Sequence, residues 1–117
     1  MRIDGLTDNV SSVLVVQEVK MPQAESVRHI DTEDVRATEW RMEPGASTGL
    51  HRHDCDFVIV PLTDGTLRNI VAGGVKMVTI TPGKAFLRKA PLEHDAFNAG
   101  DAPLAFVEVE LLKSTPR

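Results

Sequence analysis

The sequence predicts a single all-β domain, a sandwich or a barrel, and three observations support this fold class. Turn signals built on glycine or proline recur about every eight to twelve residues. Between them lie short runs that are either continuously apolar or alternating, as β-strands require. No stretch shows the apolar period of a convincing amphipathic helix, and 117 residues suffice for one domain.

The N-terminal part of the chain contains one expected strand between two polar segments. Residues 1–11 are polar, and we expect a loosely held start. Residues 12–19 are rich in Val and Leu, which predicts a strand that ends before Pro22. Residues 23–34 are polar and show no clear period, so we expect irregular chain there, with at most a short helical turn near Glu33.

Two strands are expected around the Pro44-Gly45 turn. Residues 35–43 alternate between two faces, which predicts a strand that ends at this turn. Residues 57–62 form a continuous apolar run that is short enough for a buried strand. Within this run, Pro61 predicts an edge position or a bulge, because proline cannot donate to a strand ladder.

The C-terminal half predicts a hairpin and two further strands. Residues 66–71 and 75–81 flank Ala72-Gly73-Gly74, and two such runs around a glycine pair are typical of a β-hairpin. Another strand begins at residues 85–87, after the Pro82-Gly83 turn. Residues 104–112 alternate clearly and predict the last strand.

Composition and charge exclude several classes of function. The formal net charge is −4 and no Lys/Arg cluster is visible, which argues against a nucleic-acid partner. No run approaches the roughly 20 apolar residues that span a bilayer, so we expect no membrane segment. Acidic Asp4 and Asp8 are unlike a secretory signal. Cys55 is the single cysteine, so no intrachain disulfide can form, and we expect a cytoplasmic protein.

Three histidines have the spacing of a metal site. His51 and His53 lie two residues apart, so in a strand both side chains project from one face. His94 follows about forty residues later and would come from a distant strand. Neutral imidazole nitrogens bind divalent transition metals, and we leave Fe, Zn, Ni and Mn open as the metal.

Residues from about 45 to 65 resemble the first sequence motif of the cupin superfamily, whose members are small jelly-roll β-barrels. That motif consists of a glycine, five residues, His-x-His, three or four residues, a glutamate, six residues and a glycine. Its two glycines and two histidines are present at the family spacing, whereas the glutamate position holds an apolar residue. In this sequence they are Gly45, His51, His53, Val58 in place of glutamate, and Gly65.

Residues from about 83 to 98 resemble the second cupin motif, a glycine, five residues, Pro-x-Gly, two residues, a histidine, three residues and an asparagine. The first glycine, the histidine and the asparagine are present as Gly83, His94 and Asn98, while Lys89 and Pro91 occupy the Pro and Gly positions. The resemblance implies one cupin-type jelly-roll β-barrel over residues 1–117. The sequence also resembles small stand-alone bacterial cupins, some of them linked to β-alanine degradation.

The resemblance also implies that His51, His53 and His94 are three of the four usual cupin ligands. Three neutral ligands leave the full positive charge on the ion, which strengthens it as a Lewis acid and weakens its retention. Cupin-like thiol and diketone dioxygenases resemble this three-histidine pattern. The alternative interpretation of Val58 is a barrel that has lost its metal and keeps the histidines hydrogen-bonded in a polar pocket.

Three residues near the motifs have two interpretations each. Asn98 either orients a ligand or substrate or serves as a turn residue. Asp56 either replaces the missing glutamate or is a solvated loop carboxylate. Cys55 either ligates as a thiolate or is an ordinary small buried residue.

Other charged residues are candidates for contact with substrate or are simply surface groups. An anion-binding group at the barrel mouth is expected from a basic residue near the motifs, although most of these are surface charges: Arg41, Arg52, Arg88 and Lys89. His29 lies outside both motifs, and we expect it at the surface.

Three functions remain open on this basis. The first is a metal-dependent enzyme, oxygenase-like if the metal is iron, that acts on a small polar molecule. The second is a non-catalytic cupin that binds a small ligand or acts as an accessory subunit, and the third is a metal-free isomerase with a histidine base. The partner is a small molecule in each case. Resemblance to small cupins and the apolar residues 13–16 also predict a homodimer.

Overall fold

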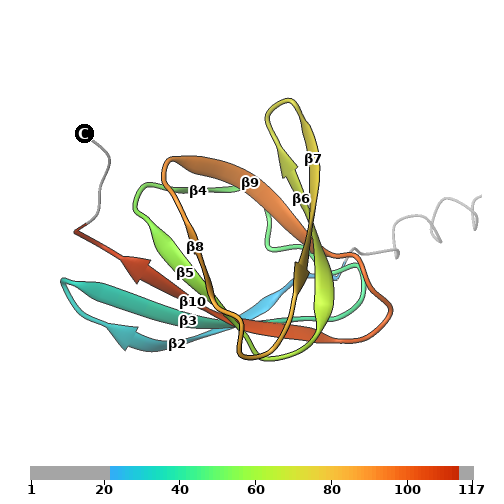
Figure 1. The fold of residues 1–117 in the computed structure, drawn as a ribbon, viewed down its shortest axis with the longest axis horizontal. Helices are drawn as coiled ribbons and strands as arrows, with labels where there is room; N and C mark the ends of the chain where they lie inside the picture. Colours follow the sequence, from blue (N-terminus) through green and yellow to red (C-terminus); the bar gives the residue numbers. More distant parts are fainter. Residues whose placement is uncertain (1–21, 114–117) are drawn as a thin grey trace, which may run out of the picture.

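The computed structural model describes residues 22–113, which form two antiparallel sheets facing each other (Figure 1). The five-stranded sheet has the order β2-β3-β10-β5-β8, and the four-stranded sheet has the order β4-β9-β6-β7. The strands are β2 (Glu25–Asp31), β3 (Val35–Met42), β4 (His51–His53), β5 (Phe57–Pro61), β6 (Gly65–Val71), β7 (Gly74–Ile80), β8 (Phe86–Arg88), β9 (Leu92–Asn98) and β10 (Leu104–Leu111). The all-β prediction is confirmed for these residues.

The core lies between the two sheets, where alternate side chains from both inner faces meet. β5 places every second residue inside, as the pleat of a β-strand requires, and β10 buries three successive residues at its start. The largest fully buried members of the core are Phe57, Met42, Ile80 and Leu104. Inward side chains of β5 and β10 therefore pack against those of β6, β7 and β9, and the two sheets share one hydrophobic core.

The first described strand, β2, is a correction to the sequence analysis. Residues 23–34 were expected to be irregular, but Glu25–Asp31 pairs antiparallel with β3, with a register shift between Arg28 and Ile30. All seven β2 residues are exposed, so the strand carries no apolar alternation that a sequence pattern would reveal. No helix forms near Glu33; the Thr32 hydroxyl accepts a hydrogen bond from the Val35 N–H at 3.0 Å and closes the β2–β3 turn.

The predicted β6–β7 hairpin is confirmed. Val71 pairs with Gly74, so the connection is the two-residue turn Ala72-Gly73, and Gly73 has a φ of +88°, which glycine adopts without strain. Pro61 pairs with β10 alone, so the predicted edge position holds locally, although β5 as a whole lies between β10 and β8, and no bulge forms there. Proline is tolerated there because β8 pairs with residues 57–59 alone and ends before it.

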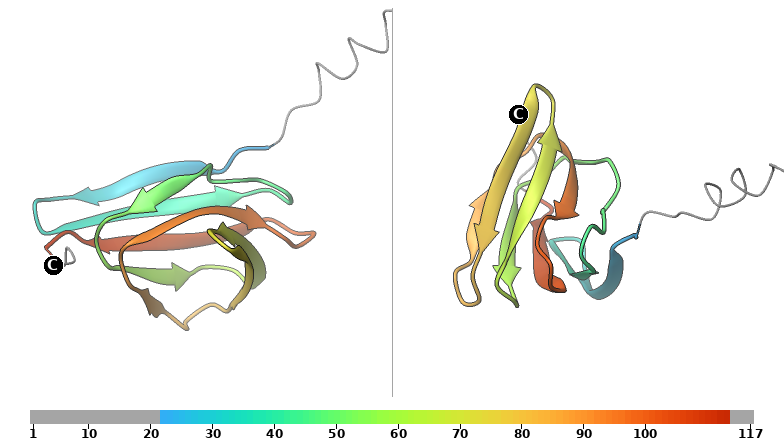
Figure 2. Two further views of the ribbon diagram at one scale, coloured as in Figure 1. Left: turned by 90° about the horizontal axis from the view of Figure 1, so that it is seen from above. Right: turned by 90° about the vertical axis from the view of Figure 1, so that its right-hand side faces the viewer.

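The barrel is less closed than predicted. Figure 2 shows the two sheets as separate layers that curve around a common interior. Isolated bridges connect them at Ser47, which pairs with Gln23 on one side and Phe97 on the other. The short strands β4 and β8, three residues each, leave little edge for continuous pairing between sheets. The arrangement is a jelly-roll sandwich in which β4 and β9 form one wall of the interior.

Some expectations fall outside the described residues. The loose segment 1–11, the strand at 12–19 and its proposed part in a homodimer belong to this group. Within residues 22–113, no helix is long and apolar enough to cross a membrane.

Candidate metal centre

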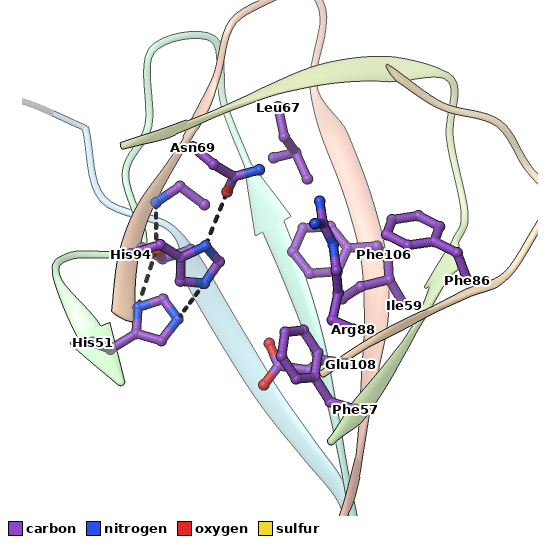
Figure 3. Close-up of a pocket in the computed structure, with 12 residues that line it drawn as sticks. His51, Phe57, Ile59, Leu67, Asn69, Phe86, Arg88, His94, Phe106 and Glu108 are labelled. Atoms are coloured by element: carbon purple, nitrogen blue, oxygen red, sulfur yellow. Dashed lines mark hydrogen bonds between the residues drawn. The ribbon is translucent and has the colours of Figure 1, made fainter. Parts of the chain in front are cut away.

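The three predicted histidines converge at one point inside the sandwich. His51 and His53 project from the same face of β4, and His51 pairs directly with His94 on the neighbouring strand β9. The Nε2 atoms of His51 and His53 lie 3.1 Å apart, those of His53 and His94 3.2 Å, and those of His94 and His51 3.1 Å. Figure 3 shows His51 and His94 side by side at one end of the pocket.

The opposite ring nitrogen of each histidine faces an oxygen atom. The Nδ1–H of His51 donates to the Gly49 carbonyl at 2.7 Å, and that of His94 donates to the Asn69 side-chain oxygen at 3.0 Å. The Nδ1 atom of His53 lies 3.7 Å from a carboxylate oxygen of Glu108. Because the Gly49 and Asn69 oxygens accept hydrogen bonds, Nδ1 of His51 and of His94 carries the ring proton when the imidazole is neutral, whereas the 3.7 Å contact of His53 is too long for a hydrogen bond.

In the neutral rings the Nε2 lone pairs of His51 and His94 therefore point at each other, and the Nε2 atom of His53 lies 3.1 Å from the first and 3.2 Å from the second. Burial, with a contribution from the neighbouring histidines, lowers the pKa of His53 to about 4. Burial likewise lowers the pKa of His94 to about 4, so both rings are neutral at pH 7. Lone pairs 3.1–3.2 Å apart without a proton between them repel, and a divalent cation among them removes the conflict. The donor set fits a divalent transition metal.

The structure shows which residue of β5 faces the histidines where the cupin motif has a glutamate, and it is not the one that the spacing predicts. The motif spacing assigns the glutamate position to Val58, but on β5 the side chains of Phe57 and Ile59 point inward and Val58 points the other way. The Phe57 ring stacks on the His53 ring, with centroids 3.9 Å apart. The side chain that β5 presents to the histidines is therefore the aromatic ring of Phe57.

A buried carboxyl on β10, Glu108, lies next to the histidines and was not selected from the sequence. Burial, with the negative charge of Glu110 second, raises the pKa of Glu108 to about 7. Glu110 is committed to Arg36, whose guanidinium donates to it at 2.9 and 3.3 Å. Glu108 thus remains a carboxyl that can hold a proton near neutral pH, facing His53 (Figure 3 shows it across the pocket from His94).

Asn69 was also missed. It lies on β6, where it shares the inner face with the buried Leu67, and its side chain is itself buried. A polar residue at an inward position of an otherwise alternating strand was the available signal for Asn69. The same signal applied to Glu108, which shares a strand face with the buried Phe106.

The other candidate residues are placed away from the three nitrogens. Asp56 accepts hydrogen bonds from Lys89 at 3.0 Å and from the Ala90 N–H at 2.9 Å. Cys55 is a buried free thiol beyond the end of β4, and burial raises its pKa. Asn98 donates to the Met42 and Ala102 carbonyls, both at 2.9 Å, and accepts from the Gly100 N–H, which is the turn role.

The basic candidates divide into two groups. Arg41, Arg52 and Lys89 form ion pairs with Glu39, Asp54 and Asp56, respectively. Arg88 instead lines the pocket beside the histidines, together with apolar side chains from both sheets. His29 is exposed as predicted, and its Nε2 lies 2.9 Å from Glu39.

The pocket itself has a narrow part and a wider part. The part between the sheets has a volume of ≈ 30 Å³ and is bounded by Phe57, Phe86, Phe106 and neighbouring side chains. A second cavity of ≈ 130 Å³ adjoins it and shares Asn69, Arg88 and His94 with it. A volume of about 30 Å³ holds a water or two, so a substrate would have to occupy the wider part.

Comparison with known proteins assigns the family. The family model described as "Cupin domain" matches residues 38–110. The chain is 46% identical over 90 residues to the β-alanine degradation protein BauB of Pseudomonas aeruginosa, covering 77% of this chain and 95% of that protein.

Solved structures agree. A cupin domain protein from Bordetella pertussis is 40% identical, with a TM-score of 0.76, covering 80% of this chain and 97% of that chain. A Klebsiella pneumoniae protein with a double-stranded β-helix domain is 20% identical, with a TM-score of 0.64 and coverage of 88% and 95%, and shows the fold alone. The chain belongs to the cupin family.

Proposed function

We propose that the chain is a metal-dependent enzyme in which His51, His53 and His94 hold a divalent transition metal and which acts on a small polar molecule. The observation that carries this proposal is the set of three Nε2 atoms within 3.2 Å of one another, with Nδ1 of His51 and of His94 hydrogen-bonded to an oxygen on the far side of the ring. The relative BauB is named for β-alanine degradation, which supports a small polar substrate.

Different residues around the histidines would have different roles in such a reaction. An ion held by three neutral ligands acts as a strong Lewis acid, and oxygenase-like chemistry would follow if it is iron. Glu108 lies 3.7 Å from Nδ1 of His53 and can accept or deliver a proton near neutral pH, because its pKa is raised to about 7 by burial. Asn69 fixes the ring of His94, and the phenyl rings of Phe57 and Phe86 exclude water.

Elemental analysis of protein purified without chelators tests the metal centre. We expect about one transition metal per chain in the wild type and a loss of at least ten-fold in occupancy for His51→Ala. His29→Ala is the matched control, since that imidazole is exposed and distant from the pocket. Wild-type protein that neither carries a metal nor takes one up from solution would contradict the proposal.

A second candidate function is a non-catalytic cupin that binds a small ligand. The observation in its favour is Phe57: the side chain that β5 turns toward the histidines is an apolar ring and not a carboxylate that could serve as a ligand. A metal-loaded protein with no turnover on any small acid or amine, but with saturable binding of one of them, would favour this candidate over the enzyme.

We also infer a homodimer in the cytoplasm. The support is the exposed edge strand β2, which leaves one side of the five-stranded sheet unpaired in residues 22–113, and the single cysteine, which needs no oxidising compartment. Sedimentation velocity at micromolar concentration distinguishes monomer from dimer.

A further inference from the structure

The wider cavity beside the histidines has an unusual charge balance. Its lining consists of Asn69, Val71, Lys76, Arg88, Leu92 and His94. Two of these side chains are permanently cationic at neutral pH, and none is acidic. The chain as a whole carries a formal charge of −4, whereas all the charged side chains of this cavity are positive.

The two cations reach the cavity from different sheets. Lys76 pairs with Asn69 across the β6–β7 ladder, so both side chains lie on the inner face of the four-stranded sheet. Arg88 pairs with Phe57 across β5 and β8, which places it on the inner face of the opposite sheet. The two positive groups therefore face a common space from opposite walls, and His94 is part of the lining of that space.

Neither cation has a carboxylate partner among residues 22–113. Other basic side chains of the described chain do have one, for example Arg36 with Glu110 and Lys113 with Asp34. The guanidinium of Arg88 lies over the Phe86 ring, 5.5 Å from its centroid, which holds it in place without neutralising it.

We propose that this cavity binds the carboxylate of a small aliphatic acid, with Arg88 and Lys76 on the carboxylate and a second polar group of the same molecule directed at the histidines. The planar guanidinium of Arg88 matches the two oxygens of a carboxylate, and Lys76 adds a point charge. Val71 and Leu92 provide apolar walls for a short carbon chain. This inference rests on the proposed function, whose substrate class it names.

The test is an NMR titration of the metal-free, full-length protein in low-salt buffer with propionate, with propionamide as its neutral counterpart. We expect propionate to shift the backbone amides around Asn69, Val71 and His94 saturably, and propionamide to bind at least ten-fold more weakly. Equal binding of the two compounds would overturn the proposal, as would inorganic phosphate binding at the same amides more tightly than propionate.

Matched variants assign the binding to the two cations. Arg88→Gln should weaken propionate binding at least ten-fold and Lys76→Gln severalfold. Arg68→Gln should leave it unchanged, because Arg68 is exposed and lies over Phe97, a ring outside the cavity lining, at 5.0 Å. Lys84→Gln is the equivalent control for Lys76, since Lys84 is exposed in the turn before β8. Unchanged affinity in folded Arg88→Gln would overturn the proposal.

Two further measurements separate this inference from the proposed function. Arg88→Lys keeps the charge and loses the planar fork, so we expect an intermediate affinity, and it replaces Arg88→Gln if that variant does not fold. Metal content should be equal in wild type and Arg88→Gln. Metal binding without propionate binding would overturn the carboxylate site alone, whereas propionate binding without metal uptake would support this site and overturn the metal-dependent function.

Discussion

At the scale of single residues, the candidate site is defined by the direction in which each imidazole is held. Gly49, Asn69 and Glu108 belong to a loop, to β6 and to β10, and each presents an oxygen to a different histidine. A hydrogen bond to Nδ1 fixes the tautomer and aims Nε2 inward. The direction of His51 is thus set by Gly49, a spacer position of the first motif, and that of His94 by Asn69, which lies outside both motifs.

Glu108 gives a pH prediction at this scale. The pKa of Glu108 is about 7 in the folded protein, whereas that of an ordinary glutamate is near 4.5, so the folded state binds more protons than the unfolded state between these pH values. The contribution of Glu108 to the free energy of unfolding of the metal-free protein is therefore fully present below pH 4.5, and it is lost as the pH rises through 7. Glu108→Gln removes this loss. We therefore expect the variant to gain on the order of 2–3 kcal/mol over wild type between pH 5 and pH 8.

Urea denaturation of the metal-free proteins at several pH values measures the effect of Glu108→Gln. Glu93→Gln is the control, because Glu93 is exposed on the outer face of β9. A difference between Glu108→Gln and wild type that stays constant from pH 5 to pH 8 would show that the carboxyl titrates as an ordinary surface group.

At the scale of elements, patterns predicted those strands whose apolar residues face the core. The β6–β7 hairpin and β10 follow from alternation and from the glycine turn. β2 has no buried residue and is held to β3 by backbone pairing, so its side chains carry no signal. The misplaced carboxylate position has a similar cause: the motif allows a spacing of three or four residues, and a one-residue step along β5 reverses the face.

As with the strands, the sequence predicted only part of the candidate site. Spacing identified the three histidines, because their phase on β4 and β9 is a local property. It did not identify Asn69 or Glu108, whose approach to the histidines depends on how β6 and β10 are placed by the packing of two sheets. Arg88 was included among several basic residues, and the ion pairs of the others distinguish it.

Gly65 provides the prediction at this scale. It begins β6 where the strand approaches β10, and a Cβ atom there would lie 2.6 Å from the Cδ1 and 3.3 Å from the Cγ of Leu104. Leu104 is buried and has little room to move. We expect Gly65→Ala to destabilise the protein by about 1–3 kcal/mol through overpacking.

Thermal and urea unfolding measure the effect of Gly65→Ala. Gly100→Ala is the control, since a Cβ at that position meets its nearest described neighbour at an ordinary 3.5 Å and its φ lies outside the left-handed region. Adding Leu104→Val to Gly65→Ala should recover part of the loss by freeing space. A Gly65→Ala variant as stable as wild type would mean that β6 and β10 separate more easily than the core packing indicates.

At the scale of the whole molecule, the site joins a weakly held edge to the rest of the fold. β4 has three residues and pairs with β9 alone among the named strands, so the wall that carries His51 and His53 has little backbone support. A metal bound by both β4 and β9 would bind the folded state and not the unfolded chain. The ion would therefore contribute to the stability of the entire domain rather than to the pocket alone.

Metal addition should consequently raise the melting temperature. At a free metal concentration of about 100 times Kd, the expected stabilisation is about 2.7 kcal/mol. For a domain of this size that corresponds to a rise of about 10–20 °C. Differential scanning calorimetry of metal-stripped protein, with and without added metal, measures it. The rise should disappear in His53→Ala and persist in His29→Ala, whose imidazole is exposed. An equal rise in both variants would show that the ion stabilises the protein from somewhere other than the three converging nitrogens.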